Sequence, residues 1–173
     1  MTGVTAGIAA AAVGLTGCAA EQRPTGFWAG FETVVVEEVD PARDLDDLAR
    51  RSETILRGRI AEARPKGTGT LLTLDVAETL LGEGDPDGDG ETVVHVAGRP
   101  GSGEPPADEL LWYLEPGDDD GALVLTDRTG AIGPDSEGGL TTLFTPTDAE
   151  RILTADLDTL VAVQARTEEL LGP

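Results

Sequence analysis

Hydrophobic and polar residues alternate along the middle of the chain with the period of two that is typical of β-strands. In the segment Thr54–Ala63, Leu56 and Ile60 fall on one face and Arg57 and Arg59 on the other. The same pattern recurs between turn-forming segments, so several short strands follow one another. The predicted strands are Phe31–Val39, Thr54–Ala63, Thr70–Leu81, Glu91–Ala97, Leu110–Leu114, Ala122–Thr126 and a last short one at Leu140–Thr145, with Thr129–Gly139 as a loop.

Helical spacing is confined to two places, which flank these strands. Asp40-Pro41 is typical of a helix start, and Ala42–Ser52 carries apolar residues at three- and four-residue spacing. Near the C-terminus, Thr147-Asp148-Ala149-Glu150 matches a capping box before a helical segment with a break near 154–156. We therefore expect a mainly β fold: a small OB-like β-barrel, with a short N-terminal helix before it and a helical segment after it.

Three segments support this fold through a resemblance. They are Ile55–Ile60, Leu74–Gly82 and Leu111–Leu114, which give a glycine-centred strand, a strand ending in Glu-x-Leu-x-Gly and an aromatic strand. Together they resemble a pattern of uncharacterised OB-like domains in secreted bacterial proteins. The resemblance implies a fold and carries over no catalytic residue.

The N-terminus indicates where the protein works. Residues Val4–Leu15 carry no charge and end in Leu15-Thr16-Gly17-Cys18. The run is too short for a transmembrane helix and fits the core of a signal peptide. Its end resembles the lipobox of bacterial lipoproteins, which implies cleavage between Gly17 and Cys18 and lipidation of Cys18. We expect a signal peptide at 1–17, a lipidated tether at 18–30 and a single barrel domain at 31–173.

One feature departs from a typical signal peptide. Met1-Thr2-Gly3 has no lysine or arginine, although a positively charged start is expected. Either the true start lies upstream or the signal is degenerate. The structural alternative is a hydrophobic N-terminal helix with a buried free cysteine.

The formal net charge of −21 limits the set of partners. Such a surface repels phosphate backbones, so we expect no nucleic-acid partner. It also repels an anionic bilayer, so membrane attachment would come from the lipid on Cys18. The chain has a single cysteine, so no disulfide within it contributes to stability.

The sharpest local motif is the acidic loop that contains Asp85, Asp87 and Asp89. It matches the first half of an EF-hand, which makes Ca²⁺ the alternative to having no cofactor. At the twelfth position of an EF-hand loop a bidentate glutamate completes the calcium shell, but the twelfth residue counted from Asp85 is Val96. A solvated hairpin loop is the simpler interpretation.

Catalytic motifs are weaker still. His95 is the only histidine, and it shares a strand face with Val93 and Ala97, which favours a half-buried structural role. No serine lies in a nucleophile elbow, and paired carboxylates cannot be located in so acidic a chain. Trp112 and Tyr113 fall on opposite faces of one strand, so we expect one in the core and the other near the surface.

The basic residues are concentrated, with seven of the twelve between Arg43 and Lys66. Arg50, Arg51, Arg57 and Arg59 could form a patch for an anionic partner, such as an envelope polymer. Cross-strand pairing with carboxylates such as Asp75 is the favoured alternative.

These features predict a lipid-anchored, extracytoplasmic binding or accessory module of the cell envelope, without catalytic activity. Its expected partners are the membrane, through the anchor, and an envelope protein or polymer. A calcium-binding surface protein using Asp85–Asp89 is the first alternative. A carboxylate-dependent hydrolase is the second.

Overall fold

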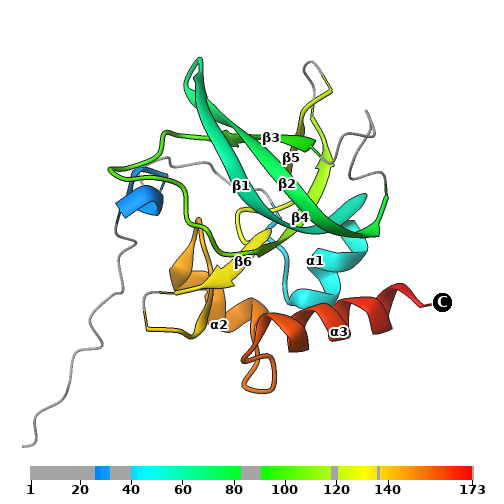
Figure 1. Cartoon of the computed structure of the whole chain (residues 1–173). Helices are drawn as coiled ribbons and strands as arrows, with labels where there is room; N and C mark the ends of the chain where they lie inside the picture. The colour runs from blue at the N-terminus through cyan, green and yellow to red at the C-terminus, as the bar shows by residue number, and fades with distance from the viewer. Residues whose placement is uncertain (1–25, 32–39, 83–90, 118–120, 136, 173) are drawn as a thin grey trace, which may run out of the picture.

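A closed five-stranded β-barrel forms the centre of the molecule (Figure 1). The computed structural model describes residues 26–31, 40–82, 91–117, 121–135 and 137–172. Its barrel strands are β1 (Thr54–Lys66), β2 (Gly69–Leu81), β3 (Glu91–Ala97), β4 (Leu110–Pro116) and β5 (Leu123–Leu125). They follow the order β1-β2-β3-β5-β4, and pairing of β1 with β4 closes the barrel. This order, with β3 parallel to β5, confirms the predicted OB-like barrel.

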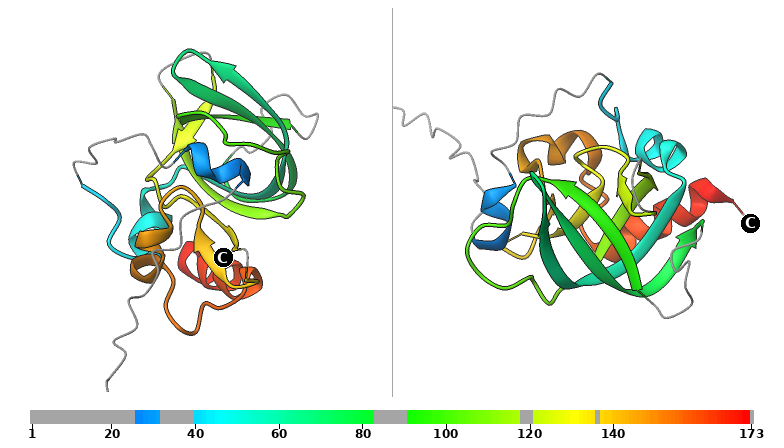
Figure 2. Two further views of the ribbon diagram at one scale, coloured as in Figure 1. Left: turned by 90° about the vertical axis from the view of Figure 1, so that its left-hand side faces the viewer. Right: turned by 90° about the horizontal axis from the view of Figure 1, so that it is seen from above.

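The α-helices and the remaining strands gather beside one wall of the barrel, whereas the N-terminal 3-10 turn lies apart from them (Figures 1 and 2). Two short strands, β6 (Ala131–Pro134) and β7 (Leu140–Thr142), extend the sheet from β4. The helices are α1 (Leu45–Arg51), α2 (Ala149–Ile152) and α3 (Leu160–Leu171), with single 3-10 turns at η1 (Gly26–Gly30) and η2 (Pro146–Asp148). In the described part of the chain, no helix has the length and apolar character needed to span a membrane.

The barrel interior is the first of two hydrophobic cores. Leu56 and Ile60 of β1 point into it together with Leu72 and Leu74 of β2, as the alternating pattern predicts. Trp112 fills its centre and donates a hydrogen bond from Nε1 to the carbonyl oxygen of Gly58 at 3.1 Å. Burial of these side chains is the main driving force for barrel closure.

The second core lies between the outer face of the barrel and the helices. Ile55, Leu111 and Tyr113 face outward there and pack against helix residues such as Leu48 and Val163. The expectation that either Trp112 or Tyr113 lies near the surface is therefore wrong, because both are fully buried. Helices cover the outer face of β4, so both of its faces are apolar.

One end of the barrel is closed by aromatic side chains from the N-terminal side. Phe27 and Phe31 are buried in the inner core, and the Phe31 ring lies 5.1 Å from that of Phe144. The amide N–H of Gly101 donates to the carbonyl oxygen of Phe27 at 2.7 Å, which ties η1 to the loop after β3. The last residues of the predicted tether at 18–30 are thus packed against the barrel.

Three local predictions were wrong. Helix α1 begins at Leu45, and its N-cap is Asp44 rather than Asp40, with Asp44 Oδ1 accepting from the N–H of Asp47 at 2.7 Å. Thr147 lies in η2 and makes no capping box, whereas Thr159 caps α3. The predicted loop 129–139 contains β6, which pairs with β4 and β7. The break near 154–156 is confirmed, and the strand predicted at 31–39 lies outside the described residues beyond Phe31.

Candidate binding groove beside the parallel strand pair

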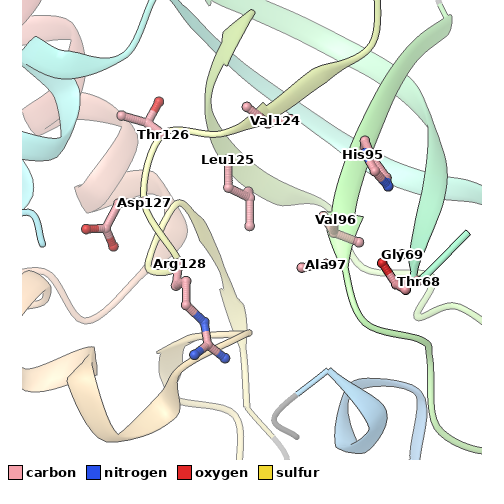
Figure 3. Close-up of a pocket in the computed structure, with 10 residues that line it drawn as sticks. All are labelled: Thr68, Gly69, His95, Val96, Ala97, Val124, Leu125, Thr126, Asp127 and Arg128. Carbon is pink, nitrogen blue, oxygen red and sulfur yellow. The ribbon is translucent and has the colours of Figure 1, made fainter. Parts of the chain in front are cut away.

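Among the neighbouring strands of the barrel, β3 and β5 share the fewest paired residues. These parallel strands pair at two positions, Val94 with Leu123 and His95 with Val124, and then diverge. A groove of about 350 Å³ opens where they separate toward the end of β3 (Figure 3). It is lined by Thr68, Gly69, His95, Val96, Ala97, Val124, Leu125, Thr126, Asp127 and Arg128.

The groove has an apolar floor and a polar rim. Val96 and Leu125 pack against the inner core, so their side chains form the deepest part. Ala97 and Val124 add apolar surface, and Thr68 contributes a hydroxyl from the turn between β1 and β2. An apolar lining with a few fixed polar groups is typical of small-ligand sites.

His95 is the polar group whose position is most unusual. Its Nε2 is buried and has no hydrogen-bond partner among the described residues. A Cβ at Gly69 would lie 2.5 Å from this nitrogen, so the imidazole fits there only because residue 69 is a glycine. Leaving a buried nitrogen unpaired is costly. A ligand that draws the ring toward the groove would offset that cost.

The carboxylate of Asp127 organises the rim. Its Oδ1 accepts hydrogen bonds from the N–H and the hydroxyl of Thr129, at 2.7 and 2.6 Å, and its Oδ2 accepts from the N–H of Ala42 at 2.6 Å. The hydroxyl of neighbouring Thr126 lies 3.0 Å from that of Ser52. These contacts use the carboxylate to hold the backbone, which suits a rigid binding surface better than proton transfer.

Two of the sequence-predicted sites, the lipidation site and the acidic loop, are not among the residues that the structure describes. Gly17 and Cys18, and the loop residues Asp85, Asp87 and Asp89, fall outside the described residues. Within the described ranges, no group of three or more histidine, cysteine or acidic side chains is placed to hold a metal ion.

The four arginines of the predicted patch are each engaged within the chain. Arg57 lies 3.2 Å from Glu78 and 3.5 Å from Glu109. Arg59 donates from Nε to Asp75 at 2.8 Å, so the expected cross-strand pair is confirmed. The two α1 residues bond to backbone carbonyls, Arg50 to that of Asp46 at 3.0 Å and Arg51 to that of Asp40 at 2.9 Å.

Most of the groove residues were missed by the sequence analysis. Gly69 and Arg128 are far apart in the sequence and line the same groove because β3 lies between β2 and β5. No local signal marked the groove. It opens because β5 (Leu123–Leu125) is shorter than β3, whereas the sequence predicts a longer strand at Ala122–Thr126.

The fold and the groove together define an OB-like β-barrel domain with an apolar surface groove. Comparison of the chain with known protein families, and with curated protein sequences, finds no match.

Proposed function

We propose that this protein is a lipid-anchored, extracytoplasmic binding or accessory module of the cell envelope, and that it is not an enzyme. The observation that carries the proposal is the segment Leu15-Thr16-Gly17-Cys18 at the end of an uncharged run. Signal cleavage before Cys18 would leave this cysteine as the lipidated N-terminal residue.

The short distance in sequence between the anchor and the barrel supports this proposal. Gly26, the first residue of η1, follows Cys18 by eight positions. An extended chain spans at most about 3.6 Å per residue, so about 30 Å separates the anchor from the barrel at the limit. Since Phe27 and Phe31 are buried, the anchored chain would hold the barrel close to the membrane.

The groove supports a binding role over a catalytic one. Asp127, its carboxylate, accepts three hydrogen bonds, and the hydroxyl of Thr126 is paired with that of Ser52. These groups shape the surface and are not arranged around a nucleophile. The apolar floor would bind an apolar ligand group by excluding water.

Mass spectrometry of the native protein tests the anchor. The expected product begins at Cys18 and carries diacylglyceryl and acyl groups, and a Cys18→Ser variant should leave the membrane fraction. An unmodified Cys18 with residues 1–17 still attached would refute the envelope assignment.

A pair of matched variants tests the groove. Ala97→Arg places a long charged side chain in the groove, whereas Ala61→Arg makes the same change at an exposed position of β1. Envelope components captured by the wild type should be lost with Ala97→Arg and retained with Ala61→Arg. Equal capture by all three proteins would exclude the groove as the binding surface.

A further inference from the structure

The end of the barrel opposite the aromatic residues contains a second cavity, of about 320 Å³. Thr54 of β1 and Thr92 of β3 each precede an inward-facing core residue, Leu56 and Val94, by two positions. Successive inward positions of a strand lie two residues apart, so the two threonines form a polar layer at this end. The opposite end is closed by Phe27 and Phe31 instead.

Thr92 supplies the observation that points to a ligand. Thr92 is only 2% exposed, and its hydroxyl has no hydrogen-bond partner among the described residues. Thr92 lines the cavity together with Thr54 and Glu53. Glu53 is an exposed residue. The backbone of Glu53 is fixed because its N–H donates to the carbonyl oxygen of Leu114 at 2.9 Å.

Apolar side chains line the rest of the cavity. Val93, which is 36% exposed, and Leu123 lie on either side of the parallel pair of β3 and β5, and Pro116 closes the β4 side. The residues that line the cavity thus include one acidic residue and two threonines beside apolar residues. All three polar groups can accept hydrogen bonds.

We propose that this cavity binds a primary alkylammonium group, such as a lysine side chain of a partner. An ammonium group has three donors and no acceptor, and its single positive charge matches the carboxylate of Glu53. Its methylene stem would pack against Val93 and Leu123. The net charge of −21 attracts cations to the whole surface, and the cavity adds selectivity for this shape.

The number of available oxygens distinguishes an ammonium from a divalent cation. Calcium takes six to eight oxygen ligands. The described side chains of the cavity supply one carboxylate and two hydroxyls, and the described residues hold no group of three or more metal-ligating side chains. Three acceptors equal the number of donors on an ammonium group. This site goes beyond the proposed function, because it does not depend on lipidation of Cys18.

Titration of the full chain with n-pentylammonium, followed by NMR, tests the proposal, with the neutral n-pentanol as the matched ligand. Pentylammonium should shift the amide signals of Thr92 and Val93 and bind more tightly than pentanol. Glu53→Gln should weaken this binding roughly tenfold. Glu104→Gln removes the same charge from an exposed loop at the other end of the barrel and should change the affinity less than about twofold.

Thr92→Val separates ligand binding from stability. Valine has the same shape and removes the unpaired hydroxyl, so the variant should be at least as stable as the wild type and bind pentylammonium about fivefold more weakly. Equal binding of pentylammonium and pentanol, or equal losses for Glu53→Gln and Glu104→Gln, would overturn the proposal. Binding of calcium in place of pentylammonium, abolished by Glu53→Gln, would also overturn it and identify a metal site.

Discussion

A buried pair of hydroxyls joins helix α3 to the barrel beneath the apolar contacts of the second core, and this pair allows a quantitative test. Tyr113 Oη lies 2.7 Å from Thr167 Oγ1, and the Thr167 hydroxyl donates to the carbonyl oxygen of Val163 at 2.9 Å. Thr167 has one hydroxyl proton, so Tyr113 must be the donor in their shared bond. Both residues are fully buried.

This direction of donation predicts unequal costs for the two single variants. Tyr113→Phe removes one neutral hydrogen bond and leaves Thr167 bonded to Val163, so it should lower the free energy of unfolding by about 1 kcal/mol. Thr167→Val leaves the phenol buried without a partner and should lower it by about 2–3 kcal/mol. In the double variant no orphaned phenol exists, so its loss should fall short of the sum by about 1–2 kcal/mol.

Urea unfolding of the wild type, the two single variants and the double variant measures these values. Thr167→Ser serves as the control, because it keeps the hydroxyl and should keep the coupling with Tyr113. Additivity of the two changes within about 0.3 kcal/mol would refute the proposed role of this pair in docking α3.

The same phenol predicts a loss of stability in alkali. Burial raises the pKa of Tyr113 far above its ordinary value near 10. The unfolded chain therefore loses the phenol proton first as the pH rises. Stability from this group is complete below about pH 10 and falls above it by about 1.4 kcal/mol per pH unit. Tyr113→Phe should show a smaller alkaline loss, measured by urea unfolding at several pH values.

Two further variants test contacts that hold loops. Asp127→Ala removes the acceptor of the buried N–H of Ala42 and of the N–H of Thr129. The free energy of unfolding, measured with urea, should therefore fall by about 2–3 kcal/mol. A change smaller than about 0.5 kcal/mol would contradict this role of Asp127. Thr154→Ala should raise the pKa of Asp156, because the Thr154 hydroxyl is the main cause of its lowered value. The stability that comes from this lowered pKa is present above about pH 4 and is lost in acid. NMR titration of the Asp156 carboxyl measures the pKa in both proteins. An equal pKa in the wild type and in Thr154→Ala would contradict the role of the Thr154 hydroxyl.

Much of the inner face of the barrel could be predicted because β1 and β2 alternate in hydrophobicity. The spacing predicts Leu56 and Ile60 on one face of their strand, and both are buried in the inner core. Strand β4 broke this rule because Leu110–Leu114 is a continuous apolar run with both faces covered. Such a run signals burial on two sides, which makes the buried position of Tyr113 understandable afterwards.

The start of α1 could not be predicted from local residues. Both Asp40 and Asp44 have the right side chain for an N-cap, and Pro41 favours the first. The structure uses Asp44, because the N–H of Ala42 is held by Asp127, which lies 85 positions further along the chain. A contact at that separation leaves no trace in the local sequence, and the same holds for the groove residues.

The parallel strands β3 and β5 lie between the two cavities, and their short pairing predicts low local stability. Two residue pairs connect these strands, and a cavity opens at each end of the pair. Few contacts mean a low free energy of local opening, so amide exchange should be faster in Leu123–Leu125 than in Leu110–Leu114, which pairs with three strands. A ligand that bridges β3 and β5 stabilises the closed form by mass action and should slow exchange in β5 selectively. Uniform exchange rates over the whole barrel would show that β3 and β5 do not separate before the rest of the barrel unfolds. The short pairing of these strands would then not explain the two cavities.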